Sequence, residues 1–198
     1  MCGIVGYVGS KEAAPLLLDG LKRLEYRGYD SAGIATLCNG HFEIHRAAGK
    51  LSILLEKMAN TKAPGTVGIA HTRWATHGRP TEQNAHPHTD CTGKVVAVHN
   101  GIFENFAERK AELASRGHRF RSETDTEVFA HEVEDAFHGD LLAAVQSATK
   151  KLTGAYAVLV SSSGEPGVLV AAREGPPIAL GLGENENWVA SDPVALIP

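Results

Sequence analysis

The chain has 198 residues, 43% of them hydrophobic, and a formal net charge of −4 at pH 7. A chain of this length and apolar content can bury a full core, so we expect a folded domain. The negative net charge excludes a broadly basic face that could bind nucleic acid or anionic lipid. Its apolar runs are too short to cross a bilayer, and no basic segment with an apolar stretch opens the chain. We therefore expect neither a membrane span nor a secretory signal.

The cysteines are sparse and odd in number: Cys2, Cys38 and Cys91. Disulfide frameworks are typical of secreted domains and use even sets of cysteines, so this set does not resemble one. We expect a protein of the reducing cytoplasm, in which Cys38 and Cys91 are unreactive thiols.

Short runs of β-branched and apolar residues recur along the chain and predict strands. The predicted strands are Ile4–Val8, Gly33–Leu37, His41–His45, Val67–Ala70, Val95–His99, Ala155–Val160, Val168–Ala172, Ile178–Leu182 and Trp188–Ala190. Several of them are apolar at consecutive positions, which is typical of strands covered on both faces.

Apolar residues at helical spacing predict helices between these strands. The stripes are Leu17, Leu21 and Leu24; Leu51, Leu54, Leu55 and Met58; Phe129, Val133, Ala136 and Phe137; and Leu141, Val145, Ala148 and Leu152. We expect a weaker helix over Asn105–Ser115, ended by Gly117.

The predicted helices fall into two groups between blocks of strands and do not alternate strictly with them. This order favours a layered α+β architecture with two facing sheets over a doubly wound parallel sheet. The last third is almost all strand and turn, and it stops at Pro198 without a capping element. We therefore expect the chain to be a fragment of a longer protein.

Cys2 directly follows the initiator Met1, which is generally removed before a small side chain. Removal would leave a thiol and an α-amino group on one residue, with ordinary pKa values of roughly 8.5 and about 7.7–8.0. A thiol becomes a strong nucleophile when a base takes its proton, and a terminal amine can be that base. Gly3 would let other backbone approach this nucleophile closely. The alternative is a cysteine that stands at the second position by accident.

Residues 71–78 (HTRWATHG) follow a predicted strand and end in a glycine, which predicts a loop of the kind that carries binding groups. The planar guanidinium of Arg73 suits a carboxylate. Trp74 beside it could form a lid. A surface ion pair and a half-buried tryptophan are the alternative interpretation.

Residues 99–105 (HNGIFEN) follow another predicted strand. An Asn-Gly pair is a common tight turn, but a helix follows here instead of the second strand of a hairpin. The side-chain N–H of Asn100 beside the backbone N–H of Gly101 makes a plausible oxyanion hole.

Residues 122–127 (SETDTE) stand where a helix is predicted to begin. Thr124 and Glu127 match a capping box, and Asp125 would lie in the first turn, where negative charge stabilises a helix. Asp125 could serve the helix alone, or its carboxylate could also receive a ligand ammonium group.

Five of the ten histidines fall within 71–99, and the pair His86 and His88 lies close to Cys91. This group leaves a metallohydrolase open as an alternative. However, no carboxylate-bearing metal motif and no Cys-x-x-Cys pair accompanies it. Nucleotide-binding glycine motifs are also incomplete.

Six segments occur in one order between residues 2 and 127: 2–6 (CGIVG), 26–33 (YRGYDSAG), 71–78, 84–88 (NAHPH), 99–105 and 122–127. Together they resemble the class II glutamine amidotransferases, a family of N-terminal-nucleophile hydrolases. The match continues as far as Ser191 and Asp192. Within this family, the sequences of the six segments are most similar to those of the members that aminate fructose 6-phosphate.

The resemblance implies a four-layer αββα sandwich, lacking its C-terminal end, in which residues 1–198 form a type 2 glutaminase domain. It implies that Cys2 is the nucleophile, with its α-amino group as base, and that Asn100 and Gly101 form the oxyanion hole. Arg73 would bind the α-carboxylate of L-glutamine and Asp125 its α-amino group. Trp74, Thr76 and His77 would lie in the loop that closes over the substrate. Arg27 would support the end of the site that carries the nucleophile.

The resemblance also implies what lies outside this chain. Family members of this kind continue into sugar-isomerase domains, which bind fructose 6-phosphate and receive ammonia for glucosamine 6-phosphate synthesis. The full-length protein would be a homodimer, and the reaction needs no cofactor or metal. Since Cys2, Asn100 and Gly101 are all present, the pattern favours a working glutaminase over a binding module without turnover.

Overall fold

The computed structural model of the chain describes residues 2–74 and 78–197. Within them, the strands are β1 (Gly3–Val8), β2 (Ser31–Cys38), β3 (His41–Ala48), β4 (Val67–Arg73), β5 (His88–Thr89), β6 (Val95–Gly101), β7 (Tyr156–Ser162), β8 (Leu169–Glu174), β9 (Ala179–Gly183) and β10 (Glu186–Ala190). The α-helices are α1 (Ala13–Arg23), α2 (Leu51–Met58), α3 (Phe106–Ser115), α4 (Asp125–Ala136) and α5 (Leu141–Thr149). Two short 3-10 turns, η1 (Glu25–Arg27) and η2 (Pro193–Leu196), complete these elements.

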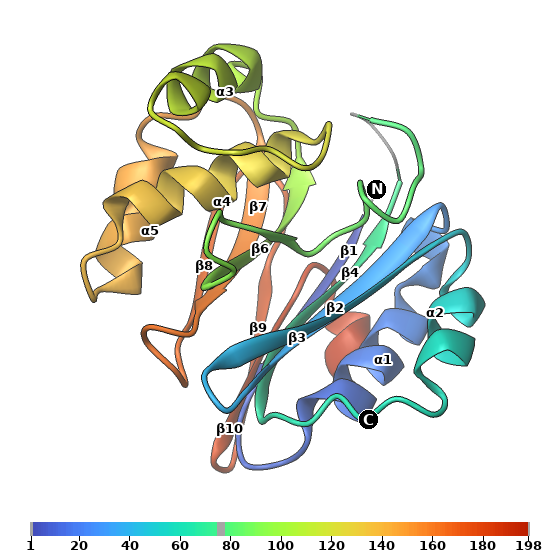
Figure 1. Cartoon of the computed structure of the whole chain (residues 1–198). Helices are drawn as coiled ribbons and strands as arrows, with labels where there is room; N and C mark the ends of the chain where they lie inside the picture. The colour runs from blue at the N-terminus through green and yellow to red at the C-terminus, as the bar shows by residue number, and fades with distance from the viewer. Residues whose placement is uncertain (1, 75–77, 198) are drawn as a thin grey trace.

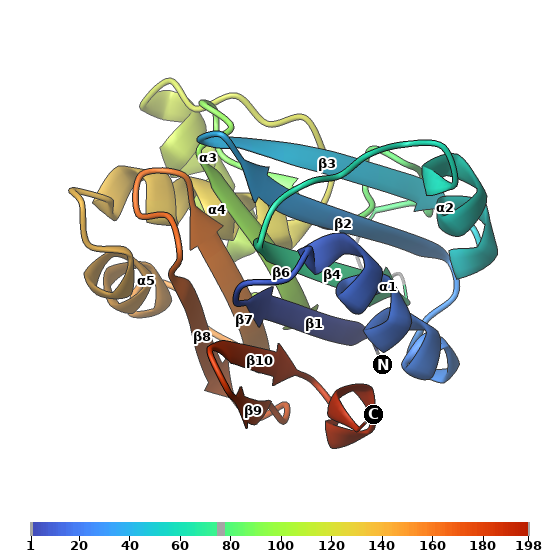
Figure 2. The same ribbon diagram turned by 90° about the horizontal axis from the view of Figure 1, so that it is seen from below.

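The strands form two antiparallel sheets that lie face to face (Figures 1 and 2). One sheet has the order β3-β2-β4-β1-β10-β9, and the other has the order β5-β6-β7-β8. Helices α1 and α2 pack on the outer face of the first sheet, while α4 and α5 cover the outer face of the second. The result is the predicted four-layer αββα sandwich.

Alternating side chains explain why the central strands are continuous apolar runs. In β6, Val96 and Val98 belong to the layer between the sheets, whereas Val95 and Ala97 face the helices. Successive strand residues point to opposite faces, so a strand buried on both sides needs apolar residues at nearly every position. The same alternation places Ile4 of β1 in the layer between the sheets.

The register of the first sheet fixes where β1 begins. Strand β1 pairs with β4 on one side and with β10 on the other, and Gly3 stands opposite Thr72. The residue before Gly3 is therefore held beside the end of β4. This places Cys2 next to Trp74, the residue that follows Arg73.

The predicted elements all occur, with ends that differ by a few residues, but the predicted capping box was wrong. Thr124 does begin α4, yet its hydroxyl bonds to Ser122 and His88 and makes no cap. Glu127 instead accepts the backbone N–H groups of Arg121 and Ser122, so the capping box does not form.

One short element near the end of the described residues was not predicted. No helical turn was predicted there, but Pro193–Leu196 form η2, which packs against α1. The side chain of Asp192 accepts the backbone N–H of Val194 and caps this turn. Across the described residues, none of the helices combines the length and apolar character that crossing a membrane requires.

Candidate functional site

Cys2 lies at the head of β1, where it meets the end of β4. The backbone N–H of Trp74 donates a hydrogen bond to the Cys2 Sγ atom at 3.2 Å, and Sγ lies 3.6 Å from the Trp74 carbonyl oxygen. Burial raises the pKa of the Cys2 thiol, although the Trp74 N–H acts in the opposite direction. The thiol therefore needs a base to become a thiolate near neutral pH.

The carbonyl oxygen of Cys2 accepts two hydrogen bonds from opposite sides. Arg27 Nε donates to it at 3.2 Å, and Asn100 Nδ2 donates at 3.0 Å. Arg27 also forms an ion pair with Asp192 at 2.9 Å, which fixes the guanidinium. These contacts hold the backbone of Cys2 in one position.

Gly3 is required here because side chains, rather than the backbone predicted above, lie against it. A Cβ atom at Gly3 would lie 2.6 Å from Thr72 Oγ1 and 2.9 Å from Leu24 Cβ. No larger residue fits directly after Cys2 without displacing its neighbours.

Asn100 and Gly101 stand at the end of β6, in the sheet opposite Cys2. Gly101 has φ of +131°, and a Cβ atom there would lie 2.0 Å from the Ala155 carbonyl oxygen. Only glycine combines this backbone conformation with such a close approach. The Asn-Gly pair is thus a strand end and not the turn of a hairpin.

His71 orients the side chain of Asn100, a contact that the sequence analysis did not foresee. His71 Nε2 lies 3.0 Å from the Asn100 Oδ1 atom and 3.0 Å from the His99 carbonyl oxygen. Both partners are acceptors, so Nε2 carries the hydrogen. Burial lowers the pKa of His71 to about 3, which keeps the ring neutral. With Oδ1 held, the Nδ2 group of Asn100 must point towards Cys2.

Arg73 is 3% exposed at the end of β4. Its guanidinium donates to the carbonyl oxygens of Gly78 at 3.2 Å and Arg79 at 3.4 Å. Burial lowers the pKa of Arg73, but nearby carboxylates, Asp30 first among them, oppose this shift. The side chain therefore places a positive charge at a largely buried position.

Asp125 is the first residue of α4 and is 4% exposed. Its Oδ2 atom accepts the backbone N–H of Phe103 at 3.0 Å and lies 3.7 Å from His99 Nδ1. The carboxylate thus contacts the loop after β6 as well as its own helix.

Several of the residues described above line one cavity of about 380 Å³. Of the predicted site residues, the structure brings together Cys2, Arg27, Arg73, Trp74, Asn100, Gly101 and Asp125. The predicted Thr76 and His77 lie outside the described residues. The wall also includes Pro176 and Pro177, which follow β8 and carried no motif in the sequence. A volume of this size holds a small metabolite and not a polymer.

The metal group suggested by His86, His88 and Cys91 is not formed. His86 Nε2 bonds to the Thr126 hydroxyl at 2.7 Å, and His88 Nε2 bonds to the Thr124 hydroxyl at 3.0 Å. Burial lowers the pKa of both rings well below the ordinary value, so they are neutral. They support the start of α4 and the wall of the cavity.

Comparison with known proteins decides the family of this chain. The family described as "Glutamine amidotransferase domain" matches residues 71–198. The chain belongs to this glutamine amidotransferase family. The matched segment includes Arg73, the Asn100–Gly101 pair and Asp125.

Relatives of this amidotransferase domain are longer than the chain. A protein from Thermus thermophilus, named glutamine–fructose-6-phosphate aminotransferase [isomerizing], is 56% identical over 198 residues, which are 100% of this chain and 33% of that protein. A protein of the same name from Pyrococcus horikoshii is 52% identical over 194 residues, 97% of this chain and 32% of that protein. The chain therefore spans about a third of the length of these relatives.

Solved structures share the fold. Glutamine phosphoribosylpyrophosphate amidotransferase from B. subtilis, in complex with ADP and GMP, has a TM-score of 0.84 and 27% sequence identity. The similarity covers 98% of this chain and 43% of that one. A class II domain protein from Silicibacter pomeroyi, at 17% identity and a TM-score of 0.64, shares the fold alone.

The buried neutral histidines predict a loss of stability in mild acid. Unfolded histidines take up protons as the pH falls through about 6.5, whereas burial keeps the pKa of His71, His86 and His88 below that value in the fold. These three histidines therefore leave the free energy of unfolding unchanged above pH 7. As the pH falls below 7, they lower it. The loss is about 1.4 kcal/mol per pH unit for each histidine once the pH is well below 6.5.

Urea unfolding at pH values of about 7.5, 6.5 and 5.5 measures this slope. The exposed His138 serves as the control, because His138→Gln should leave the slope unchanged. A free energy of unfolding that stays constant across this range would contradict neutral burial of the three rings.

Proposed function

We propose that this domain hydrolyses the side-chain amide of L-glutamine to glutamate and ammonia, with Cys2 as the nucleophile. The observation that carries the proposal is the convergence of Cys2, Asn100–Gly101, Arg73 and Asp125 on one cavity. A thiol, two N–H donors, a cation and an anion are the groups that covalent attack on the amide of a zwitterionic amino acid requires. Membership of the amidotransferase family supports the same reaction.

The first step is attack by Cys2. After removal of Met1, the α-amino group of Cys2 accepts the thiol proton while Sγ forms a bond to the amide carbon. Because burial raises the thiol pKa, few molecules hold a thiolate before substrate binds. A base on the same residue, with an ordinary pKa of about 7.7–8.0, removes the proton as the bond forms.

The carbonyl electrons of the substrate then move to oxygen and form an oxyanion. Asn100 Nδ2 carries two hydrogens and donates one to the Cys2 carbonyl oxygen. The second hydrogen and the N–H of Gly101 are the donors that would stabilise this charge. Loss of such a donor typically costs roughly 3–4 kcal/mol in the barrier.

Collapse of the tetrahedral intermediate breaks the carbon–nitrogen bond, and the protonated amine returns its proton to the departing nitrogen. Ammonia leaves, and a γ-glutamyl thioester remains on Cys2. Water, deprotonated by the same amine, attacks the thioester and releases glutamate. No cofactor enters this sequence of steps.

Specificity comes from the two charged groups at the end of the substrate. Arg73 would bind the α-carboxylate and Asp125 the α-ammonium group, because a planar fork and a carboxylate match these partners. Trp74 is 48% exposed and contacts the Tyr29 ring at a centroid distance of 5.2 Å. We infer that it belongs, with Thr76 and His77, to a loop that covers bound glutamine, and that Arg27 supports Cys2.

We take residues 1–198 to form a single class II glutaminase domain of a longer, cytoplasmic enzyme. The name of the relatives supports fructose 6-phosphate as the ammonia acceptor, bound by domains outside this chain. The whole protein, which we propose to be a homodimer, would then make glucosamine 6-phosphate. The chain alone would release free ammonia.

Replacement of the nucleophile should abolish turnover. We expect Cys2→Ala, with Met1 removed, to lower kcat for glutamine hydrolysis at least about a thousand-fold, because no other residue supplies the thioester. Glutamate release measures the rate, and Cys38→Ala is the matched control with full activity. A Cys2→Ala protein that keeps its activity would remove the central assignment.

The charged pair should control substrate affinity more than turnover. Arg73→Lys and Asp125→Asn should each raise KM by about 10- to 100-fold, because lysine lacks the bidentate fork of arginine and asparagine lacks the negative charge of aspartate. The exposed Arg79 lies in the same loop, so Arg79→Lys is the control. Equal KM values for Arg73→Lys and Arg79→Lys would contradict the role of Arg73.

His71 should act through Asn100. We expect His71→Phe to lower kcat by about 10- to 100-fold without raising KM, because the donor that aligns the oxyanion-hole amide is lost. His71→Gln, whose amide N–H can reach the same acceptors, should recover part of the rate. A folded His71→Phe protein with unchanged kcat would show that the contact does not position Asn100 for catalysis.

A further inference from the structure

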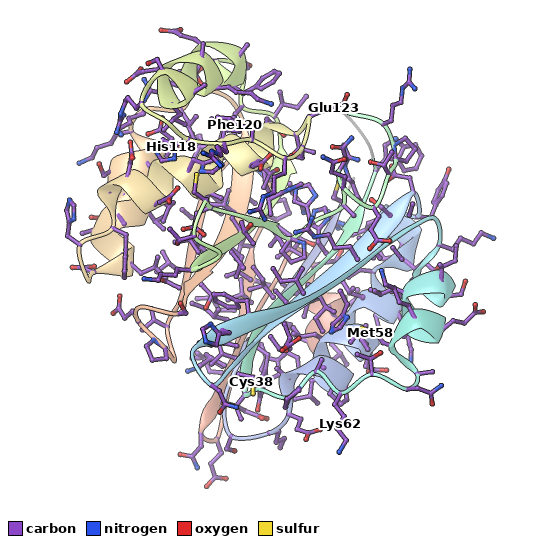
Figure 3. All side chains as sticks on the ribbon, in the orientation of Figure 1. Cys38, Met58, Lys62, His118, Phe120 and Glu123 are labelled. Carbon is purple, nitrogen blue, oxygen red and sulfur yellow. The ribbon has the colours of Figure 1, made fainter. Side chains whose placement is uncertain are left out.

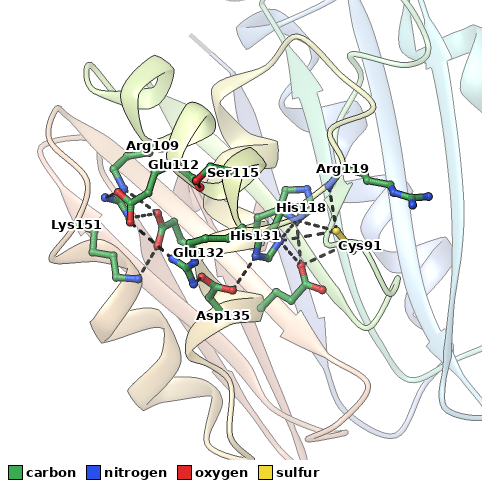
Figure 4. A network of polar contacts seen from close by, with 12 residues as sticks. Cys91, Arg109, Glu112, Ser115, His118, Arg119, His131, Glu132, Asp135 and Lys151 are labelled. Atoms are coloured by element: carbon green, nitrogen blue, oxygen red, sulfur yellow. Dashed lines mark hydrogen bonds and ion pairs between the residues drawn. The ribbon is translucent and has the colours of Figure 1, made fainter.

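Four potential metal ligands converge beside α4, and none of them is among the residues that line the cavity with Cys2. Figure 4 labels three of them, Cys91, His118 and His131. Cys91 lies in the turn between β5 and β6, and His118 lies in the loop after α3. His131 and Glu134 lie one turn apart on α4. Cys91 Sγ, the two histidine Nδ1 atoms and Glu134 Oε2 all lie within 4.8 Å of one another.

The distances between these atoms approach those of a tetrahedron around zinc. The two Nδ1 atoms of His118 and His131 are 3.2 Å apart, and each is 3.0 Å from Glu134 Oε2. Cys91 Sγ lies 3.8 Å from one Nδ1 atom and 3.7 Å from the other. For bonds to zinc of about 2.0–2.1 Å from nitrogen and about 2.3 Å from sulfur, the tetrahedral separations are about 3.4 Å and about 3.6 Å.

Hydrogen bonds alone account poorly for this arrangement. Good contacts from both Nδ1 atoms to Glu134 would require a hydrogen on each nitrogen. Two such hydrogens would then lie close together beside Glu134 Oε2, because the two nitrogens are only 3.2 Å apart. If either nitrogen lacks its hydrogen, its lone pair faces the carboxylate. A cation at the centre removes the conflict, because all four atoms then direct lone pairs at it.

The surrounding contacts are those of a metal site. His118 Nε2 bonds to Asp135 Oδ1 at 2.7 Å, which orients the ring so that Nδ1 faces inward. The backbone N–H of Arg119 donates to Cys91 Sγ at 3.3 Å and so holds the sulfur atom in place. Carboxylate–histidine pairs and N–H groups of this kind orient and tune the ligands of metal centres.

We propose that Cys91, His118, His131 and Glu134 bind one structural Zn²⁺ ion. Thiolate and imidazole ligands in a tetrahedron select zinc over magnesium or calcium, which prefer oxygen ligands. Four protein ligands close the site, so the ion has no open position for a reacting water. The site is independent of the proposed glutaminase reaction.

The ion would hold together three segments that are separate in the sequence. It links the turn before β6 and the loop after α3 to the C-terminal half of α4, whose first residue is Asp125. Phe120 packs edge-on against His131 at a centroid distance of 4.6 Å, so the loop already lies against the helix. Metal binding would therefore stabilise the loop that leads to Asp125.

The test uses the whole chain without any affinity tag, purified from cells grown with zinc. Elemental analysis measures the zinc content, and chelator competition measures the affinity. We expect one zinc per chain, and we expect Co²⁺ in its place to show the intense absorption of a tetrahedral site with a sulfur ligand. Cys91→Ser and His118→Gln should weaken binding by more than about 100-fold, and Asp135→Asn by about 10- to 100-fold.

Three controls separate this site from other thiols and imidazoles. Cys38→Ser and His138→Gln should keep the zinc; Figure 3 shows Cys38 far from His118. Cys2→Ala should also keep it, so a failed glutaminase assignment leaves this test intact. If ligand variants do not fold, loss of the Co²⁺ bands and a lower Tm after chelation of the wild type support the site. Less than about a tenth of an equivalent of zinc, with no tetrahedral Co²⁺ spectrum, would overturn the proposal.

Discussion

The hydrogen bond from Asn100 Nδ2 to the Cys2 carbonyl oxygen, at 3.0 Å, joins the two sheets at the site. Cys2 heads a strand of one sheet, and Asn100 ends a strand of the other, so neither sheet alone contains the chemistry. The apolar layer between the sheets, with Ile4, Ile69 and Val98 fully buried, sets their separation. Burying each such side chain contributes roughly 1.5–3 kcal/mol. The core of the sandwich thus aligns Cys2, the proposed nucleophile, with Asn100 and Gly101, the proposed oxyanion donors.

Burial explains the protonation states of the thiol and of the histidines at the site. Burial keeps His71, His86 and His88 neutral and raises the pKa of the Cys2 thiol. Neutral imidazoles act here as fixed donors and acceptors rather than as bases. Our proposal therefore takes the base from the α-amino group of Cys2, which a processed terminus would place on the same residue as the thiol.

The architecture and most of the cavity could be predicted from the sequence because both depend on local patterns. Apolar runs indicated strands buried on both faces, and the motifs around Arg73, Asn100 and Asp125 are contiguous. Contacts between distant segments could not be predicted in this way. Spacing suggested Cys91 with His86 and His88, whereas the fold brings Cys91 to His118 and His131. The role of Glu127 was also missed, because its partners are backbone groups before the helix.

The central claim is that a processed N-terminal cysteine attacks a glutamine held by two charged groups. Intact-mass analysis after treatment with an electrophilic glutamine analogue tests it most directly. The account predicts a single adduct on a chain lacking Met1, located at Cys2 by peptide mapping and prevented by excess glutamine. A chain that retains Met1 should remain unmodified. An adduct on Cys38 or Cys91, or equal labelling with Met1 in place, would contradict the account.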